Sequence, residues 1–262
     1  MSWNIRRRIR HIIPKAADRW DRRSPGLREL LRAELPTLLG VQEALPDQAR
    51  FVGEALGDGY RWIGKGRSAK GIGEGCPIYY DAERLRLVEW EQVALSNEPT
   101  RPGSTSWGNF LPRILVSATF EDRATSRRFL ALNTHLDHVS ARSRLRSAHA
   151  ILNITSTAAL PTVVTGDMNA GFGSAPLREL LGSGLLTETW GAARNRDSTE
   201  WGTFSNYRAP RNGGKRLDWI LASPDFRIDR AAINEQRHAG VWGSDHLPVQ
   251  AVMVLLGNSA QH

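Results

Sequence analysis

Short apolar runs, each bounded by Gly, Pro, Asn or Asp, recur along the whole 262-residue chain. This punctuation is typical of many short β-strands. It predicts strands at 37–41, 61–63, 76–80, 84–95, 114–120, 129–133, 162–165, 217–221 and 249–255. Helical signals are fewer and predict helices at 27–35, 46–56, 140–159 and 175–181. Helices between some strands, with hairpin-like strands elsewhere, predict a layered α/β sandwich.

Composition narrows the class of protein. The single cysteine excludes an intramolecular disulfide framework and a cysteine-rich zinc module. No segment approaches the roughly 20 uninterrupted apolar residues of a membrane helix. The N-terminus is basic but lacks the apolar core of a signal peptide, so we expect a cytoplasmic protein with no membrane partner. The absence of a linker-like change in composition predicts one domain over residues 1–257 and a short tail at 258–262.

Positive charge is concentrated in two stretches of the chain. The net charge is +8; residues 1–32 hold ten Lys and Arg against three Asp and Glu, and residues 191–216 hold six against two. In the second stretch the arginines are interspersed with Trp201, Phe204 and Tyr207, which suits stacked bases and phosphates. Such patches attract nucleic acid and other polyanions. The structural alternatives are a solubilising surface and aromatic side chains that pack the loop against a sheet.

Two glycine-containing segments invite comparison with phosphate-binding loops. Residues 64–75 contain glycines at 64, 66, 71, 73 and 75, but the strand-to-helix context of a dinucleotide-binding loop is missing. The segment Gly213-Gly214-Lys215-Arg216 lacks the Ser or Thr of a P-loop. We therefore assign neither segment to phosphate binding.

Polar residues adjoin the ends of several predicted strands. They are Asn4, Glu43, His135, Asp167, Asn169, Asp218, Asp245 and His246. Because strand ends on a rigid sheet can direct several side chains to one point, we expect these residues to converge. Together they supply acidic oxygen ligands for a hard cation, a carboxylate that can handle a water, and amide and histidine donors for an anion. This combination predicts metal-assisted hydrolysis of a phosphate ester.

Each of these residues also has a purely structural interpretation. Glu43 could supply negative charge at the N-terminus of the following helix. Asp167 and Asn169 could form a turn, a role that both residue types favour. His135 taken alone could be a hydrogen-bonded core histidine, and Asp245 could serve the turn before Pro248. The set as a whole nevertheless specifies a single chemistry.

Taken in order, these motifs resemble the endonuclease/exonuclease/phosphatase superfamily, which includes DNase I-like nucleases, deadenylases, sphingomyelinases and inositol polyphosphate 5-phosphatases. The resemblance rests on Trp3-Asn4-Ile5-Arg6, Gln42-Glu43, Gly73-Glu74-Gly75 with Pro77-Ile78-Tyr79-Tyr80, Leu111-Pro112-Arg113-Ile114, Asn133-Thr134-His135-Leu136-Asp137-His138, Thr165-Gly166-Asp167-Met168-Asn169-Ala170, Arg216-Leu217-Asp218-Trp219-Ile220 and Ser244-Asp245-His246-Leu247-Pro248-Val249. It implies a four-layer α/β sandwich of two packed, mostly antiparallel sheets flanked by helices. It also implies dependence on Mg²⁺ or Mn²⁺.

The resemblance implies a metal ligand and a group that handles water. Glu43 corresponds to the main metal ligand, with Asn4 near the metal. Asp167 corresponds to the residue that orients or deprotonates the attacking water, and Asn169 to one that holds a phosphate oxygen. Asp218 corresponds to a residue that supports the same network.

The resemblance also implies contacts to the substrate phosphate. His246, oriented by Asp245, corresponds to a residue that contacts the scissile phosphate, and His135 to a donor to its non-bridging oxygens. Either the Asp167-type or the His246-type residue could act as the base. Arg113 and Arg144 are further candidates for phosphate contacts, although Arg144 could equally be an exposed helix residue.

Three hypotheses for the function follow. The arginines at 6, 7 and 8, directly after Asn4, favour a nuclease or phosphodiesterase that acts on nucleic acid or nucleotides. The alternative is a phosphatase or phosphodiesterase for a small phosphorylated metabolite or dinucleotide cofactor, because no nucleic-acid-binding appendage is evident. A binding protein without catalysis is the third hypothesis, and the presence of every expected polar residue disfavours it.

Overall fold

Two β-sheets packed face to face form the centre of the molecule in the computed structural model, which describes residues 1–9 and 16–257. The first sheet has seven strands in the order β10 (Asn195–Arg196), β12 (Phe226–Ile233), β13 (Val249–Leu255), β1 (Ser2–Asn4), β2 (Leu38–Gln42), β4 (Ile78–Asp81) and β3 (Tyr60–Ile63). The second sheet has six, in the order β5 (Leu85–Ala94), β6 (Ile114–Asp122), β7 (Arg127–His135), β8 (Thr162–Asp167), β11 (Asp218–Ala222) and β9 (Thr187–Glu188). The pairs β1–β2, β7–β8 and β10–β12 are parallel, and the other paired strands described are antiparallel.

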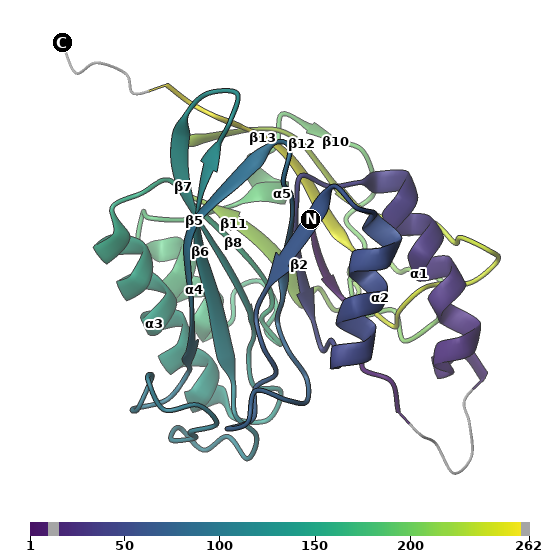
Figure 1. Cartoon of the computed structure of the whole chain (residues 1–262), viewed down its shortest axis with the longest axis horizontal. Helices are drawn as coiled ribbons and strands as arrows, with labels where there is room; N and C mark the ends of the chain where they lie inside the picture. Colours follow the sequence, from purple (N-terminus) through teal and green to yellow (C-terminus); the bar gives the residue numbers. More distant parts are fainter. Residues whose placement is uncertain (10–15, 258–262) are drawn as a thin grey trace.

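Helices cover the outer face of each sheet (Figure 1). Helices α1 (Trp20–Glu34) and α2 (Pro46–Leu56) lie on the seven-stranded sheet, whereas α3 (Ala141–Ala158) and α4 (Ala175–Gly182) lie on the six-stranded sheet. A short helix, α5 (Thr189–Ala192), and a 3₁₀ turn, η1 (Ala16–Asp18), lie in connecting segments. The four-layer α/β sandwich is thereby confirmed. No helix of the described chain is both long and apolar enough to cross a membrane.

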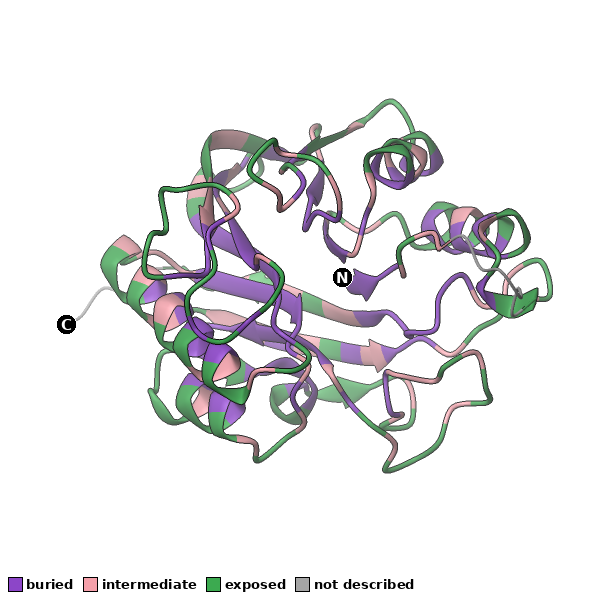
Figure 2. Ribbon diagram, turned by 90° about the horizontal axis from the view of Figure 1, so that it is seen from below, coloured by how far each residue is buried: buried purple, intermediate pink, exposed green. Residues whose placement is uncertain are grey.

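Apolar residues fill the three spaces that separate the four layers. The strands of the two central sheets contain much of the buried part of the chain (Figure 2). Leu27 and Leu31 of α1 pack on Leu39 and Val41 of β2, and Ile151 of α3 packs on the other sheet. Each of these side chains is essentially inaccessible to water. Burying an aliphatic side chain of this size contributes about 1.5–3 kcal/mol.

A buried polar network between the sheets holds strand β2 against β7 and β8. The Gln42 amide donates to Asn133 Oδ1 at 2.7 Å, and Asn133 Nδ2 donates to the Val41 carbonyl at 2.8 Å. Thr165 Oγ1 also donates to Asn133 Oδ1, at 3.1 Å. The sheets approach so closely here that a Cβ on Gly40 would lie 2.1 Å from Thr165 Oγ1. Since buried polar groups need their partners, this network sets where the ends of the three strands meet.

Each predicted strand and helix overlaps an observed one, but one helix begins earlier than predicted and several elements, among them β9, β10, β12 and α5, were not predicted. Helix α1 begins at Trp20, seven residues before its predicted start, so Ser24-Pro25 is not its N-terminal cap. Pro25 lies early in the helix, where its missing N–H removes only one intrahelical bond. Strand β12 was not predicted, because Arg227, Asp229 and Arg230 interrupt its apolar residues. The predicted tail at 258–262, and the basic residues at 10, 11 and 15, lie outside the described residues, and the single-domain assignment stays a prediction.

Candidate active site

Strand register places three of the candidate residues side by side at one edge of the six-stranded sheet. His135 ends β7 directly beside Asp167, which ends the parallel strand β8. Asp218 begins the antiparallel strand β11 and pairs with Asp167 from the other side. Asp167 and Asp218 are almost fully buried, and His135 is 8% exposed. Residues more than 30 positions apart thus form one continuous polar row.

Asn4 and Glu43 approach this row from the other sheet. Asn4 ends β1, and Glu43 follows β2, its parallel neighbour. The Asn4 amide nitrogen donates to Glu43 Oε1 at 3.0 Å and to Asp167 Oδ2 at 2.9 Å, so one amide holds two carboxylates together. Its oxygen accepts the backbone N–H of Arg6 at 2.9 Å. Asn4 therefore joins the two sheets at the site.

Two of these residues have left-handed backbone conformations. Glu43 has a φ of 61° and Asn169 a φ of 45°. Such a conformation costs a non-glycine residue about 1–3 kcal/mol, less for asparagine, and persists only where its surroundings hold it. Glu43 is held by the Arg7 N–H, which donates to Oε2 at 3.0 Å, and Asn169 donates its own N–H to Asp167 Oδ1 at 2.9 Å. Both bonds fix a polar side chain toward the same point.

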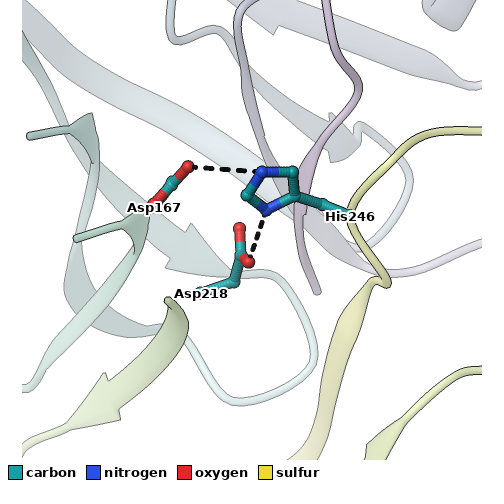
Figure 3. Close-up of side chains that lie close together, drawn as sticks. All are labelled: Asp167, Asp218 and His246. Carbon is teal, nitrogen blue, oxygen red and sulfur yellow. Dashed lines mark hydrogen bonds and ion pairs between the residues drawn. The ribbon is translucent and has the colours of Figure 1, made fainter. Parts of the chain in front are cut away.

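His246 lies between two carboxylates (Figure 3). Its Nδ1 is 2.7 Å from Asp218 Oδ2, and its Nε2 is 3.9 Å from Asp167 Oδ2. Burial alone would disfavour the charged ring, but the charge and hydrogen bond of Asp218 and the charge of Asp167 raise the pKa of His246 to about 10. At neutral pH this ring is therefore an imidazolium that can donate from Nε2.

His135 has the opposite protonation state. Its Nε2 is 2.9 Å from the Asn169 amide nitrogen and 3.6 Å from Asp167 Oδ2. Burial lowers the pKa of His135 to about 4, against the favourable charge of Asp167. The ring is therefore neutral at pH 7, and its Nε2 accepts a hydrogen bond from the Asn169 amide.

The two carboxylates that share Asn4 also differ. Burial opposes ionisation of Glu43, but the positive charge that His135 carries at low pH, the Arg7 N–H and the Asn4 amide lower the pKa of Glu43 to about 2. Burial and the charge of Asp218 instead raise the pKa of Asp167. Glu43 is thus a permanent anion, whereas Asp167 has a higher affinity for a proton than an ordinary aspartate.

Asp245 does not orient His246, so that part of the sequence prediction is wrong. The ring of His246 bonds to Asp218, which the register of β11 brings beside it. The Asp245 carboxylate lies instead 3.6 Å from Arg6 Nε and accepts a bond from the Ser244 hydroxyl at 3.3 Å. Asp245 therefore belongs to the wall of the site beside Arg6.

The two predicted phosphate-binding arginines are both engaged by one segment of the chain. Arg113 is 2% exposed and pairs with Asp137 at 3.2 Å, and one of its nitrogens lies 3.0 Å from His138 Nδ1. Arg144 donates to the Asp137 carbonyl at 2.7 Å. Their contact with phosphate stays a prediction.

A different arginine reaches the site, and sequence reasoning missed it. Arg67 lines a small recess together with Glu43, Glu74, Arg113 and His135. It comes from the glycine-rich segment 64–75, which joins strand β3 to strand β4 and so lacks the strand-to-helix context of a phosphate-binding loop. The glycines marked the segment as unusual, but no sequence signal placed it beside Glu43.

The donor groups at this edge suit a hard divalent cation. Asp167, Asp218 and His246 can offer ligand atoms that lie within 4.8 Å of one another. While His246 is protonated, its ring cannot be a ligand, because a metal binds neutral imidazole. Glu43 remains ionised and faces the same space, so its carboxylate with the neighbouring polar oxygens fits Mg²⁺ or Mn²⁺ better.

The pH dependence of the unfolding free energy should report the charge on His246. A folded-state pKa of about 10, above the ordinary 6.5, gives stability that is complete below about pH 6.5 and is lost as the pH rises through about 10. We expect the unfolding free energy of wild type to fall relative to His246→Gln across this range, by at most about 1.4 kcal/mol per pH unit. Urea unfolding in EDTA buffer measures it. The exposed His149→Gln should show no such difference; a constant gap between wild type and His246→Gln would contradict the assignment.

A two-sheet α/β sandwich with carboxylate, amide and imidazole groups converging at one edge defines a phosphoester hydrolase of the DNase I-like class. The chain belongs to the Endonuclease/Exonuclease/phosphatase family, whose model matches residues 1–246. Members of this family are phosphoester hydrolases that depend on divalent metal ions. A sequence search of curated proteins finds no match.

Solved structures resemble this chain over nearly its whole length. A mannosyl-6-phosphatase of Bacteroides thetaiotaomicron is 28% identical, with a TM-score of 0.89 over 97% of this chain and 98% of that one. An endonuclease/exonuclease/phosphatase family protein of the same organism is 27% identical, with a TM-score of 0.91 over 100% and 95%. The human Nocturnin catalytic domain is 20% identical, with a TM-score of 0.68 over 96% and 91%, and shares the fold.

Proposed function

We propose that this protein hydrolyses a small phosphomonoester, of the sugar-phosphate type, with the help of a divalent metal ion. The observation that carries the hydrolytic activity is the convergence of Asn4, Glu43, Asp167 and the Asp218–His246 pair at one edge of the sandwich. These groups meet the needs of phosphoryl transfer, in which negative charge collects on oxygen and fixed donors and a cation stabilise it.

Ion pairing within the chain supports a small substrate over a nucleic acid. Of the arginines that follow β1, Arg6 lies near Asp18 and Asp245, Arg8 pairs with Asp47, and Arg7 shares its carboxylate, Glu74, with another arginine. Charges already paired in this way attract a polyanion less than free ones do.

The aromatic residues of the 191–214 segment lead to the same proposal. Phe204 packs 5.0 Å from the His246 ring, and the Tyr207 hydroxyl donates to Asp18. Trp201 packs on the cluster that contains Trp190. These rings are engaged within the protein and do not form a free stacking platform. The likeness to a mannosyl-6-phosphatase supports the same class of substrate.

The charge states of Asp167 and His246 suggest their roles. Asp167, with its raised pKa, accepts one proton of the attacking water. The water oxygen bonds to phosphorus as the bond from phosphorus to the ester oxygen breaks, and the leaving alkoxide takes a proton from solvent. His246, kept charged by Asp218, donates from Nε2 to a phosphoryl oxygen.

The remaining residues hold the substrate and the cation. Glu43, with Asn4 beside it, would hold a divalent cation, and that cation would neutralise phosphate charge. The Asn169 amide bonds to His135 and to the Leu136 carbonyl, and it donates to a phosphate oxygen when the substrate replaces one of these partners. His135 keeps that amide oriented and can itself donate from Nδ1.

A hydrolysis panel tests the proposed function. Mannose 6-phosphate, p-nitrophenyl phosphate, bis(p-nitrophenyl) phosphate, nucleotides, and single- and double-stranded DNA and RNA are incubated with Mg²⁺ or Mn²⁺, with EDTA controls. We expect phosphate release from the monoesters and no cleavage of polymers. Efficient polymer cleavage that weakens steeply with salt would instead establish the nuclease hypothesis. No hydrolysis of any ester would contradict both.

A further inference from the structure

Two arginines meet one carboxylate beside the recess that Glu43 and His135 line. Arg7 Nη1 and Arg67 Nη2 each lie 2.9 Å from the same atom, Oε1 of Glu74. Two guanidinium groups thus share one carboxylate. These three side chains carry a net charge of about +1, which Glu43 in the same recess balances until it binds a cation.

Each of the other arginines at the site has at least one carboxylate of its own. Arg6 lies 3.5 Å from Asp18, 3.6 Å from Asp245 and 3.9 Å from Glu43, so it is outnumbered by carboxylates. Arg113 is matched by the buried Asp137, as described above. Among these arginines of the described chain, Arg7 and Arg67 are therefore the pair whose positive charge exceeds that of the carboxylate they bond to.

The glycine-rich loop is built to hold Arg67 in this place. Its backbone folds back on itself, with the Gly66 N–H donating to Gly71 O at 3.0 Å and the Arg67 N–H donating to Glu74 O at 2.8 Å. The two sides approach so closely that a Cβ on Gly66 would lie 2.3 Å from the carbonyl carbon of Ile72. Gly75 N–H donates to the carbonyl of Ala44, the neighbour of Glu43, at 2.8 Å. The loop is thereby fixed to the residue that presents Glu43.

The recess is also shielded from water. The Arg67 side chain is 12% exposed and that of Glu74 10%, whereas that of Arg7 is 48% exposed. A buried guanidinium interacts more strongly with an anion than an exposed one, because less water screens the two charges. A phosphate at this place would meet Arg67 from the protein side and Arg7 from the solvent side.

We propose that Arg67, assisted by Arg7, binds the phosphate group of the substrate and selects monoesters over diesters. A phosphomonoester carries about two negative charges near pH 7, whereas a diester carries one. A guanidinium fork bonds to phosphate oxygens through two parallel N–H donors, and the second charge strengthens the pair. This inference rests on the proposed function, which it deepens by naming the residues that read the phosphate.

The variants Arg67→Met, Arg67→Lys and Arg7→Met test the inference. Arg84→Met is the matched control, because Arg84 pairs with Asp122 at the opposite end of the sandwich and is 49% exposed. For each variant, KM and kcat are measured with p-nitrophenyl phosphate and bis(p-nitrophenyl) phosphate, together with the Ki of inorganic phosphate. Calorimetric titration of inorganic phosphate into EDTA-treated protein gives binding without turnover. Circular dichroism and Tm check that each variant is folded.

For Arg67→Met we expect the monoester KM and the phosphate Ki to rise about 10- to 100-fold, because charge-assisted hydrogen bonds to the phosphate are lost. The diester KM and kcat should change by less than about threefold. Arg67→Lys should recover part of the loss, Arg7→Met should show a smaller one, and Arg84→Met should show none. Equal effects on monoester and diester, or unchanged KM and Ki in folded Arg67 and Arg7 variants, would overturn the inference while leaving the hydrolysis intact.

Failure of the proposed function gives a different result. If wild type hydrolyses no ester, the calorimetric titration still decides the role of Arg67. Phosphate binding that is lost in Arg67→Met would support an anion site without that activity, and equal binding in wild type and variant would overturn it.

Discussion

Replacing Asp167 by asparagine should lower kcat by about a thousandfold without lowering the melting temperature. The loss in rate follows because an amide cannot accept the proton of the attacking water, a role that contributes about 10²- to 10⁴-fold. Stability should be nearly kept because asparagine has the same shape and its Oδ1 can still accept the Asn169 N–H. The Asn4 amide loses its bond to Asp167 Oδ2 but keeps its bond to Glu43. Removing a buried charge that lies beside Asp218 also relieves the repulsion that raises the pKa of Asp167.

Steady-state kinetics with p-nitrophenyl phosphate and a thermal melt measure the two effects of Asp167→Asn. Asp58→Asn, at an exposed turn, is the control and should behave like wild type in both. A fall in Tm of the variant that parallels its loss of activity would mean that Asp167 is a structural group.

Removing the divalent metal, or the charge on Glu43, should have an effect of similar size. EDTA should abolish hydrolysis, and added Mg²⁺ or Mn²⁺ should restore it. For Glu43→Gln, we expect the metal concentration for half-maximal activity to rise by at least about 100-fold, since even residues that only support a ligand are worth 10- to 100-fold in metal affinity. The pKa of about 2 means that wild-type Glu43 is ionised throughout the assay range, so the variant removes a full charge.

Activity at a series of metal concentrations, and the rise in Tm on adding Mn²⁺, measure the effect of Glu43→Gln. The matched control is Glu54→Gln, on the exposed side of α2. Full activity of wild type in EDTA would contradict the metal dependence. An unchanged metal response in Glu43→Gln would move the ligand role away from Glu43.

Local patterning was enough to find most of the strands and the polar residues at their ends. An apolar run followed by Gln42-Glu43, or by Thr134-His135, indicates a buried strand and the residue near which it ends. The same approach missed β12, where Arg227 and Asp229 pair with each other on the surface. In such a strand, the charged side chains obscure the apolar period on which the prediction depends.

Histidine protonation could not be predicted in this way. His135 and His246 are both buried histidines near Asp167, and nothing in their flanking sequences separates them. The difference comes from Asp218, which bonds to His246 at 2.7 Å from a strand far along the chain. At His135 the loss of hydration outweighs the nearby negative charge and lowers the pKa. At His246 the negative charge of Asp218 outweighs the loss of hydration and raises the pKa.

The sequence by itself determined the layered α/β fold and the set of groups that the chemistry needs, because apolar periodicity and strand ends are local properties. Only the tertiary structure decided which charges meet: Asp218 rather than Asp245 at His246, and Arg67 rather than a free arginine patch beside Glu43. Electrostatic interactions depend on distance and burial, and here they join residues from about 30 to more than 200 positions apart. The pairing of charges is therefore a property of the packed sheets.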